Sequence, residues 1–465
     1  MRPSHGSSAL SATFDDPNLV LVGGLPPVVA LAQDCRLGDL VGEKLTLPAK
    51  GGVNAQLRVP VPVAGMVAGA DSIDDMDLLR HGGMDRLFAG IRAPSTLGTF
   101  LRTFTFGHVR QLDSVAAAFL TALAAAAPLL PGADEVALLD LDDTIRETHG
   151  SAKQGVGYGY TQVKGLNALL ATISTPLAAP VIAAARLRSG STNSARGAGP
   201  LLREALGTAR RCGAGGPDGT GLLLVRADSA YYTHDVIAAA RQGGACFSVT
   251  ARMTATVKAA IGSIGEDTWT AIHYPEAVWD EDGQCWISDA EVAEVPFTAF
   301  TGRRRAEHVT ARLIVRRVKR LNTNSVPVGQ GELFAAYRYH AVFTDSPLPM
   351  LEAEATHRQH AIVEQVIADL KGGPLAHLPS GKFAANSAWL VLAAMAFNLT
   401  RATGALASTF HARATTATIR AQLIAVPARL ARSARRLRLH LPQRWPWQTA
   451  WAQLFDATCG PPAAA

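Results

Sequence analysis

The chain has 465 residues, of which 48% are hydrophobic and 18% charged, and its formal net charge is +6. This length is sufficient for two to four domains, and the hydrophobic content excludes a largely disordered protein. The five cysteines are scattered and odd in number, which argues against a disulfide framework or a zinc site and favours a reducing compartment. The N-terminal residues lack the layout of a signal peptide, so we expect a soluble, cytoplasmic protein with no membrane partner.

Shifts in pattern and composition divide the chain into five expected segments. They are a mainly helical N-terminal region, a strand-rich core, a β-rich insertion, a return to the core, and a basic helical C-terminal region. The expected boundaries are 1–130, 131–253, 254–345, 346–402 and 403–465. The first segment is either a module that binds DNA ends or a helical cap, and its sequence leaves both interpretations open.

Helical patterns in the first segment occur near Ser72–His81 and Ser95–Leu112, and Pro94 followed by Ser95 is a helix start signal. The Ala-rich run Val115–Leu130 is shorter than a membrane span and contains Pro128. We therefore interpret that run as a core helix.

A buried strand that ends in carboxylates is predicted at Val136–Thr144, with the sequence Val-Ala-Leu-Leu-Asp-Leu-Asp-Asp-Thr. Carboxylates this close together raise one another's pKa in a partly dry site, and a hard divalent cation removes that cost. Asp140 and Asp142 lie on one side of the strand, and Asp143 points to the other. The alternative is an acidic strand end that simply faces solvent.

Further strands are predicted at Leu166–Thr175, Pro180–Arg188, Leu222–Val225 and Cys246–Arg252, with helices at Pro200–Arg211 and Thr233–Arg241 between the later ones. This order of three strands, helix, strand, helix and strand is that of an RNase H-like sheet, in which the first and fourth strands are neighbours. Asp228 follows the fourth strand, so it would lie beside Asp142. Asp228 could equally be an ordinary turn or cap residue.

The predicted insertion carries a hairpin at Val278–Ile287 with an Asp-Gly turn, and β-rich stretches at Ala311–Leu321 and Ala336–Thr344. Its tryptophans could stack on an unpaired base or serve as cross-strand packing. A basic cluster there suits a polyanionic partner, or forms a solvated face. The tryptophans are Trp269, Trp279 and Trp286, and the cluster begins with Arg303, Arg304 and Arg305.

An amphipathic helix is predicted over His357–Lys371, with an apolar stripe that runs from Val363 to Leu370. Glu364 lies on a neighbouring face together with several basic side chains, as expected of residues three, four and seven apart. A third acid of a metal site would fit here, although an ordinary exposed helix has the same pattern.

The C-terminal segment is predicted to be helical over Arg413–Leu441 except around Pro427, after a buried helix at Ala384–Thr400. Between His411 and Trp445 it contains eight arginines and no acid. Spacings of three or four place several of them on one helix face, where they could contact phosphates. These candidates are Arg429, Arg432, Arg435 and Arg436.

Together these residues resemble the bacterial insertion-sequence DDE transposases of the cut-and-paste type, in the branch whose third acid lies in a Tyr-x2-Arg-x3-Glu-x6-Lys signature. Glu364 and Lys371 match that spacing, whereas His357 and His360 stand where the family has Tyr and Arg. The resemblance implies that the basic positions of the signature, with Arg358 as a further candidate, position DNA phosphates. Neutral histidine donates fewer hydrogen bonds than arginine, so this role would depend on pH.

The resemblance also implies a catalytic triad of Asp142, Asp228 and Glu364 that holds two Mg²⁺ ions, which Mn²⁺ could replace. The implied fold is an α/β RNase H-like mixed sheet with helices on both faces, interrupted by a β-rich insertion and flanked by helical regions. The implied activity is phosphodiester hydrolysis and strand transfer at transposon ends. The expected partners are double-stranded DNA, as terminal inverted repeats and target, and a second copy of the chain that pairs the two ends.

Two alternatives remain from the same residues. The run Asp140-Leu141-Asp142-Asp143-Thr144 matches the Asp-x-Asp-x-Thr signature of haloacid dehalogenase-like phosphatases, in which Asp140 would be the nucleophile. Those enzymes have a parallel sheet and a later acidic pair, which the pattern here does not favour. The second alternative is an inactive DNA-binding relic of a transposase.

Overall fold

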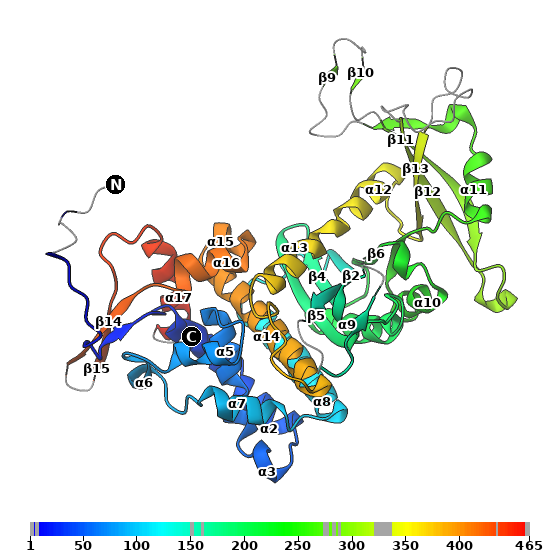
Figure 1. The fold of residues 1–465 in the computed structure, drawn as a ribbon. Coiled ribbons are helices and arrows are strands. Elements are labelled where there is room, and N and C mark those ends of the chain that lie inside the picture. The colour runs from blue at the N-terminus through cyan, green and yellow to red at the C-terminus, as the bar shows by residue number, and fades with distance from the viewer. Residues whose placement is uncertain are drawn as a thin grey trace.

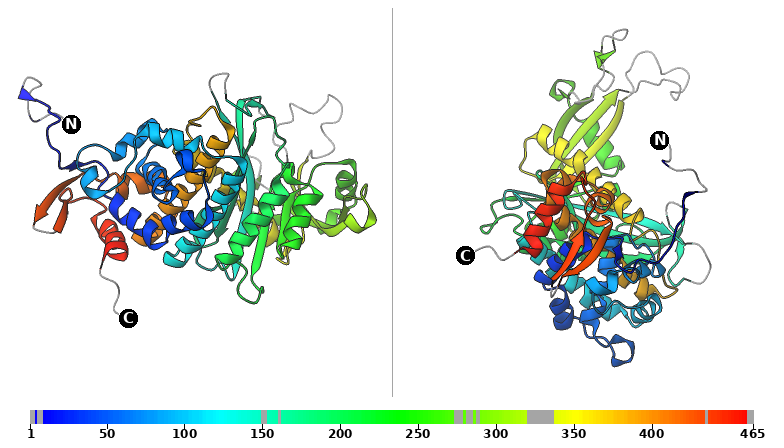
Figure 2. Two further views of the ribbon diagram at one scale, coloured as in Figure 1. Left: turned by 90° about the horizontal axis from the view of Figure 1, so that it is seen from below. Right: turned by 90° about the vertical axis from the view of Figure 1, so that its left-hand side faces the viewer.

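The computed structural model describes residues 4, 9–148, 153–159, 162–272, 279–280, 285–286, 290–319, 337–433 and 436–460. A long mixed sheet forms its centre, with the N- and C-terminal regions at one end and the insertion at the other (Figures 1 and 2). The predicted hairpin turn at Asp282-Gly283 lies outside the described residues.

The core of the sheet has the strand order β5-β4-β2-β6-β7. β4 is antiparallel to β2 and β5, whereas β6 and β7 run parallel to β2. The first and fourth core strands, β2 and β6, are therefore neighbours, and the predicted RNase H-like fold is confirmed. Their bounds are β2 (Val136–Glu147), β4 (Lys164–Thr175), β5 (Ala178–Ser189), β6 (Leu222–Ala227) and β7 (Cys246–Thr250), with a short β3 (Gly157–Tyr158) beside β4.

The register of β2 and β6 positions the first two acids. Asp140 pairs with Arg226 and Leu141 with Ala227, so the next step along the two parallel strands brings Asp142 beside Asp228. Ala137, Leu139 and Leu141 are buried, and they anchor β2 up to the point where the acids begin.

The insertion continues the core sheet. β13 pairs antiparallel with β7, and β12, β11 and β8 follow outward in antiparallel order. Trp279 pairs with Trp286 in a separate two-stranded ladder, as the predicted hairpin requires. The strands are β8 (Thr270–Ile272), β9 (Trp279–Asp280), β10 (Cys285–Trp286), β11 (Ala290–Ala299), β12 (Val309–Lys319) and β13 (Tyr337–Thr344), with α11 (Ala255–Gly262) before them.

Helices cover both faces of the core sheet. α9 (Ala198–Arg211) packs on β4 and β5, α10 (His234–Gln242) on β7, and α13 (Ile362–Lys371) on β2. α14 (Phe383–Ala407) packs on β5, an edge strand, where the Asn398 side-chain amide donates to the Ile182 carbonyl and accepts from its N–H, both at 2.8 Å. These two bonds satisfy backbone groups that an edge strand would otherwise leave unpaired.

The N-terminal region is helical, as predicted, but its boundaries differ. The pattern at Ser72–His81 forms a 3₁₀ helix at Asp74–Leu79, and that at Ser95–Leu112 is divided between α7 (Pro94–Leu101) and α8 (Phe106–Ala126). Pro94 occupies the first turn of α7, and Thr105 caps α8. The remaining helices are α1 (Leu25–Asp34), α2 (Leu37–Lys44), α3 (Ala49–Gly52), α4 (Ala55–Arg58), α5 (Pro60–Ala68) and α6 (Met84–Leu87).

The predicted helix over Arg413–Leu441 is wrong in its second half. After α15 (Thr409–Arg413), α16 (Thr416–Ile419) and a π-helical turn, the chain forms β14 (Ala428–Ser433) and β15 (Arg436–His440). β14 also pairs with β1 (Leu19–Val20), so a segment some 400 residues earlier supplies the third strand. The alternation Arg-Leu-Arg-Leu-His at 436–440 has the period of a strand, and this is the signal that helical spacing obscured. α17 (Gln448–Cys459) ends the described chain.

Two helices, α8 and α14, are long and apolar enough to cross a membrane. The apolar window of α14 is 89% buried inside the molecule, as in a core helix of a soluble protein, whereas that of α8 is 33% buried. α8 packs against α14, α2 and β5, as expected of the core helix inferred from its sequence.

Candidate active site

The first acid, Asp142, lies on β2 where the strand emerges from the core. Burial is the largest influence on its carboxyl group, and repulsion from Asp143, Asp228 and Glu364 adds to it. Together these effects raise the pKa of Asp142 to about 7. The backbone N–H of Asp143, which donates to Asp142 Oδ1 at 2.7 Å, acts in the opposite direction and lowers that pKa. The predicted acids therefore share one electrostatic neighbourhood.

The second acid, Asp228, directly follows β6. Its Oδ1 accepts a hydrogen bond of 2.9 Å from the backbone N–H of Ala230, so it also caps the 3₁₀ helix Ser229–Tyr231. Burial and the charge of Asp143 raise the pKa of Asp228, and His360 opposes this rise. Both interpretations of Asp228 thus fit the structure. The residue caps a helix, and it also lies where a second acid of the site is expected.

The third acid, Glu364, lies in the first turn of α13 and is exposed. The predicted continuous helix is interrupted here: α12 (Met350–Arg358) ends in a 3₁₀ turn at Gln359–Ala361 before α13 begins. Figure 1 shows α12 beside the insertion strands and α13 over the core. The break means that residues before and after it do not share the single helix face expected from their spacing.

His357 does not have the phosphate-contacting position expected of it. Its side chain is 4% exposed, and its ring nitrogens contact the Ser248 hydroxyl at 2.9 Å and the Thr250 hydroxyl at 3.0 Å. Burial lowers the pKa of His357 to about 3, so the ring is neutral at physiological pH. The expectation that His357 grips DNA is corrected: it fastens α12 to β7.

The other basic residues of this segment lie in three different environments. His360 is half-buried, its Nδ1 donates to the His357 carbonyl at 2.7 Å, and it acts electrostatically on Asp228. Arg358 donates to Glu354 at 2.9 Å, and Glu354 also pairs with Arg316. Lys371, at the end of α13, has a pKa lowered first by burial and then by Arg146, while Asp142 raises it. Of the predicted basic residues, His360 and Lys371 therefore interact electrostatically with the acids.

Asp140 is a structural residue. It is 1% exposed and forms a two-pronged ion pair with Arg226, whose Nε and Nη2 each donate at 2.7 Å. Arg226 also donates to the Thr356 carbonyl at 2.6 Å, which ties β6 to α12. A carboxylate held in this way cannot attack a phosphate, and the antiparallel β4 contradicts the parallel sheet of the phosphatase alternative. That alternative is overturned.

Asp143 supports the opposite face of β2. It accepts hydrogen bonds from Tyr231 at 2.7 Å, from Arg188 at 2.9 Å and from Asn167. Arg188 also donates to backbone carbonyl groups in the loop that precedes α9. Sequence reasoning missed this network and the Arg226 pair, because the partners come from strands far apart in the chain.

The donor set of the three acids fits a hard divalent cation, since all their ligand atoms are carboxylate oxygens. Burial and, after it, repulsion from the neighbouring acids raise the pKa of Asp142, and a bound cation would offset both effects. Among the described residues, no three His, Cys, Asp or Glu side chains are close enough together to enclose an ion. Closure of a metal site would therefore need a movement of side chains, and the exposed Glu364 forms no hydrogen bond or ion pair with a described residue that such a movement would break.

The predicted DNA-contacting arginines of the insertion and C-terminus lie at the surface. Arg304 and Arg305 are exposed in the turn between β11 and β12, where Arg303 pairs with Glu307 at 3.3 Å. In the C-terminal hairpin Arg429 pairs with Asp16 at 3.0 Å. Arg432 and Arg436 are exposed there, and Arg435 lies outside the described residues.

Trp269 is occupied by an intramolecular partner. The guanidinium of Arg317 lies 4.2 Å from the centre of the Trp269 ring and 4.5 Å from that of Tyr337. Arg317 also pairs with Glu291 at 2.7 Å and Glu266 at 2.8 Å. This arrangement matches the packing interpretation of Trp269 better than the stacking of an unpaired base.

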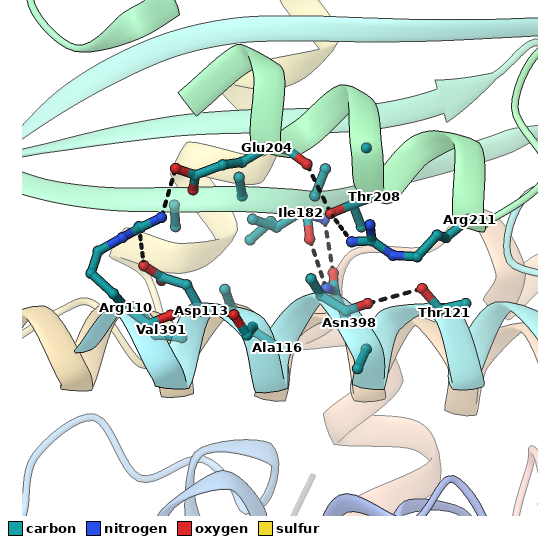
Figure 3. Close-up of a pocket in the computed structure, with 18 of the residues that line it drawn as sticks. Arg110, Asp113, Ala116, Thr121, Ile182, Glu204, Thr208, Arg211, Val391 and Asn398 are labelled. Atoms are coloured by element: carbon teal, nitrogen blue, oxygen red, sulfur yellow. Dashed lines mark hydrogen bonds and ion pairs between the residues drawn. The ribbon is translucent and has the colours of Figure 1, made fainter. Parts of the chain in front are cut away.

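A cavity of about 630 Å³ lies away from the acids, between α8, α9 and β5 (Figure 3). Arg110 of α8 reaches across it to Glu204 of α9 at 2.6 Å and pairs with Asp113 on its own helix. Alanines of α8 and β5 form much of its wall. None of Asp142, Asp228 and Glu364 lines this cavity.

Comparison with known proteins gives one family. The family model for the transposase DDE domain group 1 matches residues 59–458, which includes the core sheet, the insertion and the helix of the third acid. No curated protein shows a significant match. The matched range covers most of the 465 residues. The chain therefore belongs to the DDE transposase family.

Proposed function

We propose that the protein is the transposase of a bacterial insertion sequence, which cleaves phosphodiester bonds at transposon ends and joins the ends to target DNA. The observation that carries this proposal is the electrostatic effect of Asp228 and Glu364 on Asp142, together with the register of β2 and β6, which brings Asp142 beside Asp228. These three residues are the proposed catalytic and metal-binding acids. The Glu and Lys of the signature, at 364 and 371, support the same branch of the family.

Two Mg²⁺ ions, or Mn²⁺ in their place, would act as Lewis acids at this site and lower the pKa of a water molecule or a DNA 3′-hydroxyl. The protein's own part is positional. Asp142 is fixed by β2, and Asp228 is held by the hydrogen bond from Ala230. Glu364 lies on α13, which packs on β2. β2, the turn after β6 and α13 would thus each supply one acid to the same phosphodiester group.

DNA is the proposed substrate and partner, as terminal inverted repeats and as target. Lys371 and His360 would contact phosphates near the acids, and the exposed arginines of the insertion and of the β14–β15 hairpin would contact more distant ones. We propose a homodimer on paired ends, so that two sites act on the two ends of one element, and a cytoplasmic location.

The test is cleavage of a plasmid that carries the ends of the element found beside the gene. The wild-type chain should cut at these ends with Mg²⁺ or Mn²⁺ and not in excess EDTA. Glu364→Gln should abolish cleavage while DNA binding persists. Glu352→Gln, on the exposed surface of α12, is the matched control and should remain active.

Two outcomes would contradict the proposal. Cleavage that survives Glu364→Gln would remove the third acid from the mechanism. A wild-type chain that binds the ends but never cuts them in either metal would identify the inactive relic instead.

A further inference from the structure

Arg146 lies on β2, four residues beyond Asp142. Side chains alternate along a strand, so Asp142, Thr144 and Arg146 point to the same face of the sheet. α13 packs on β2, and Lys371 at the end of this helix interacts electrostatically with both Asp142 and Arg146, so α13 covers that face. Arg146 therefore lies on the same side of the sheet as Lys371, although the two residues are far apart in the sequence.

Among the described residues, no hydrogen bond or ion pair is formed by the guanidinium of Arg146. Its Nε is buried without any hydrogen bond, and within the described part of the chain the side chain forms no ion pair. Two other arginines of the core sheet do have partners. Arg188 of β5 and Arg226 of β6 each form an ion pair with a carboxylate of β2. An unsatisfied buried donor costs roughly 1–3 kcal/mol, so a group that binds Arg146 from outside would recover that cost.

A second cation stands beside it. Lys371 is half-buried and forms no hydrogen bond or ion pair with any described residue, and the charge of Arg146 disfavours its protonated form. Two cations held together at a surface repel each other unless an anion lies between them. An arginine fork and a lysine ammonium are the pair of donors that a phosphate group accepts most readily.

We propose that Arg146 and Lys371 jointly bind one phosphodiester group of the DNA strand that lies over the acids. This proposal rests on the proposed function for its substrate, and it assigns to Arg146 a positioning role that neither the signature nor the acid triad contains. Four strand residues span about 13 Å, and one DNA strand rises about 3.4 Å per nucleotide. After allowance for the reach of the arginine side chain, the bound phosphate lies within roughly two to four nucleotides of the bond to be cut.

Binding measured without metal tests the proposal separately from catalysis. A fluorescent blunt-ended duplex of about 20 base pairs is titrated with protein in EDTA over a range of salt concentrations. Arg146→Gln should weaken binding roughly tenfold, as expected for the loss of a hydrogen bond to a charged group. Arg146→Lys should recover part of this loss. Arg203→Gln, an exposed arginine of α9, is the matched control and should stay within about twofold of wild type.

The double variant distinguishes a shared phosphate from two separate ones. If Arg146 and Lys371 bind the same phosphate, then Arg146→Gln with Lys371→Gln should reduce the slope of log affinity against log salt by about 0.9. Two independent phosphates would reduce it by about 1.8, and that result would overturn the proposal. An Arg146→Gln variant that binds as tightly as the Arg203→Gln control would overturn it as well.

Failure of the two proposals is distinguishable. If Glu364→Gln cleaves like wild type, the proposed function fails whatever the binding data show. Urea unfolding of Arg146→Gln distinguishes a DNA-binding role from a structural one. The substitution removes an unpaired buried donor and a like-charge contact, so it should not lower the free energy of unfolding. A variant that loses stability and DNA affinity together, with an unchanged salt slope in the double variant, would mark Arg146 as structural.

Discussion

Asp142→Asn should stabilise the metal-free protein at neutral pH, although Asp142 is a proposed catalytic group. Its pKa is about 7 in the folded protein against an ordinary value of 3.8, so the folded state retains a proton that the unfolded state has lost. The resulting loss of stability is absent below pH 3.8, grows as the pH rises to about 7, and is constant above it. The difference between the two pKa values corresponds to roughly 4 kcal/mol as an upper bound. Because Asp142 is only half-buried, we expect a gain of about 1–3 kcal/mol.

Urea unfolding in EDTA at about pH 7.5 and about pH 5 measures this gain, which should shrink to less than half at the lower pH. Asp143→Asn is the matched control one residue away, and it should have the opposite sign. That substitution leaves Arg188, which is 7% exposed, without its counter-charge, and breaking such a buried pair costs about 3–5 kcal/mol. Equal losses of stability in both variants at the higher pH would refute the repulsion among the acids.

Three further outcomes follow from the same structure. Asp140→Asn should destabilise the fold by about 3–5 kcal/mol in urea unfolding because it leaves Arg226 unpaired, and unchanged stability would show that the pair is not formed. His357→Phe should cost about 1–3 kcal/mol by the loss of two hydroxyl partners. That cost should be largest at about pH 8 and shrink toward about pH 5, because the unfolded imidazole takes up a proton near pH 6.5 while the buried ring stays neutral, and a cost independent of pH would contradict its burial. In the exposed β15, Arg436→Glu together with Arg438→Glu should weaken binding to duplex DNA and lower the salt dependence of that binding. The midpoint of urea unfolding should not change. Unaltered DNA binding would exclude the hairpin from the DNA interface.

The predicted behaviour of Asp140 shows where sequence reasoning reached its limit. The sequence Asp-Leu-Asp-Asp places three acids within four residues, and strand alternation alone separates Asp143 from the other two. Nothing in that pattern distinguishes Asp140 from Asp142, which share a face. Arg226 makes the distinction, because β6 aligns it with Asp140 and leaves Asp142 beside another acid.

The two histidines show a related limit. Helical spacing groups His357 with His360 and Glu364, yet the 3₁₀ turn at Gln359–Ala361 divides the segment into two helices. His357 belongs to the first of them and is buried against β7, while Glu364 belongs to the second and faces solvent. A single helix was the simplest interpretation of a continuous apolar pattern, and the turn that breaks it contains neither proline nor glycine.

What the sequence determined by itself was local and periodic. Alternating and apolar runs predicted the core strands, and their order along the chain predicted that β2 and β6 would be neighbours, with Asp142 on the first and Asp228 directly after the second. The tertiary structure decided everything that depends on residues brought together from distant segments. It pairs Asp140 with Arg226, joins β1 to a C-terminal hairpin, and brings Arg146 beside Lys371. Periodicity reports which face a side chain occupies, but the charge opposite that face is supplied by another part of the chain.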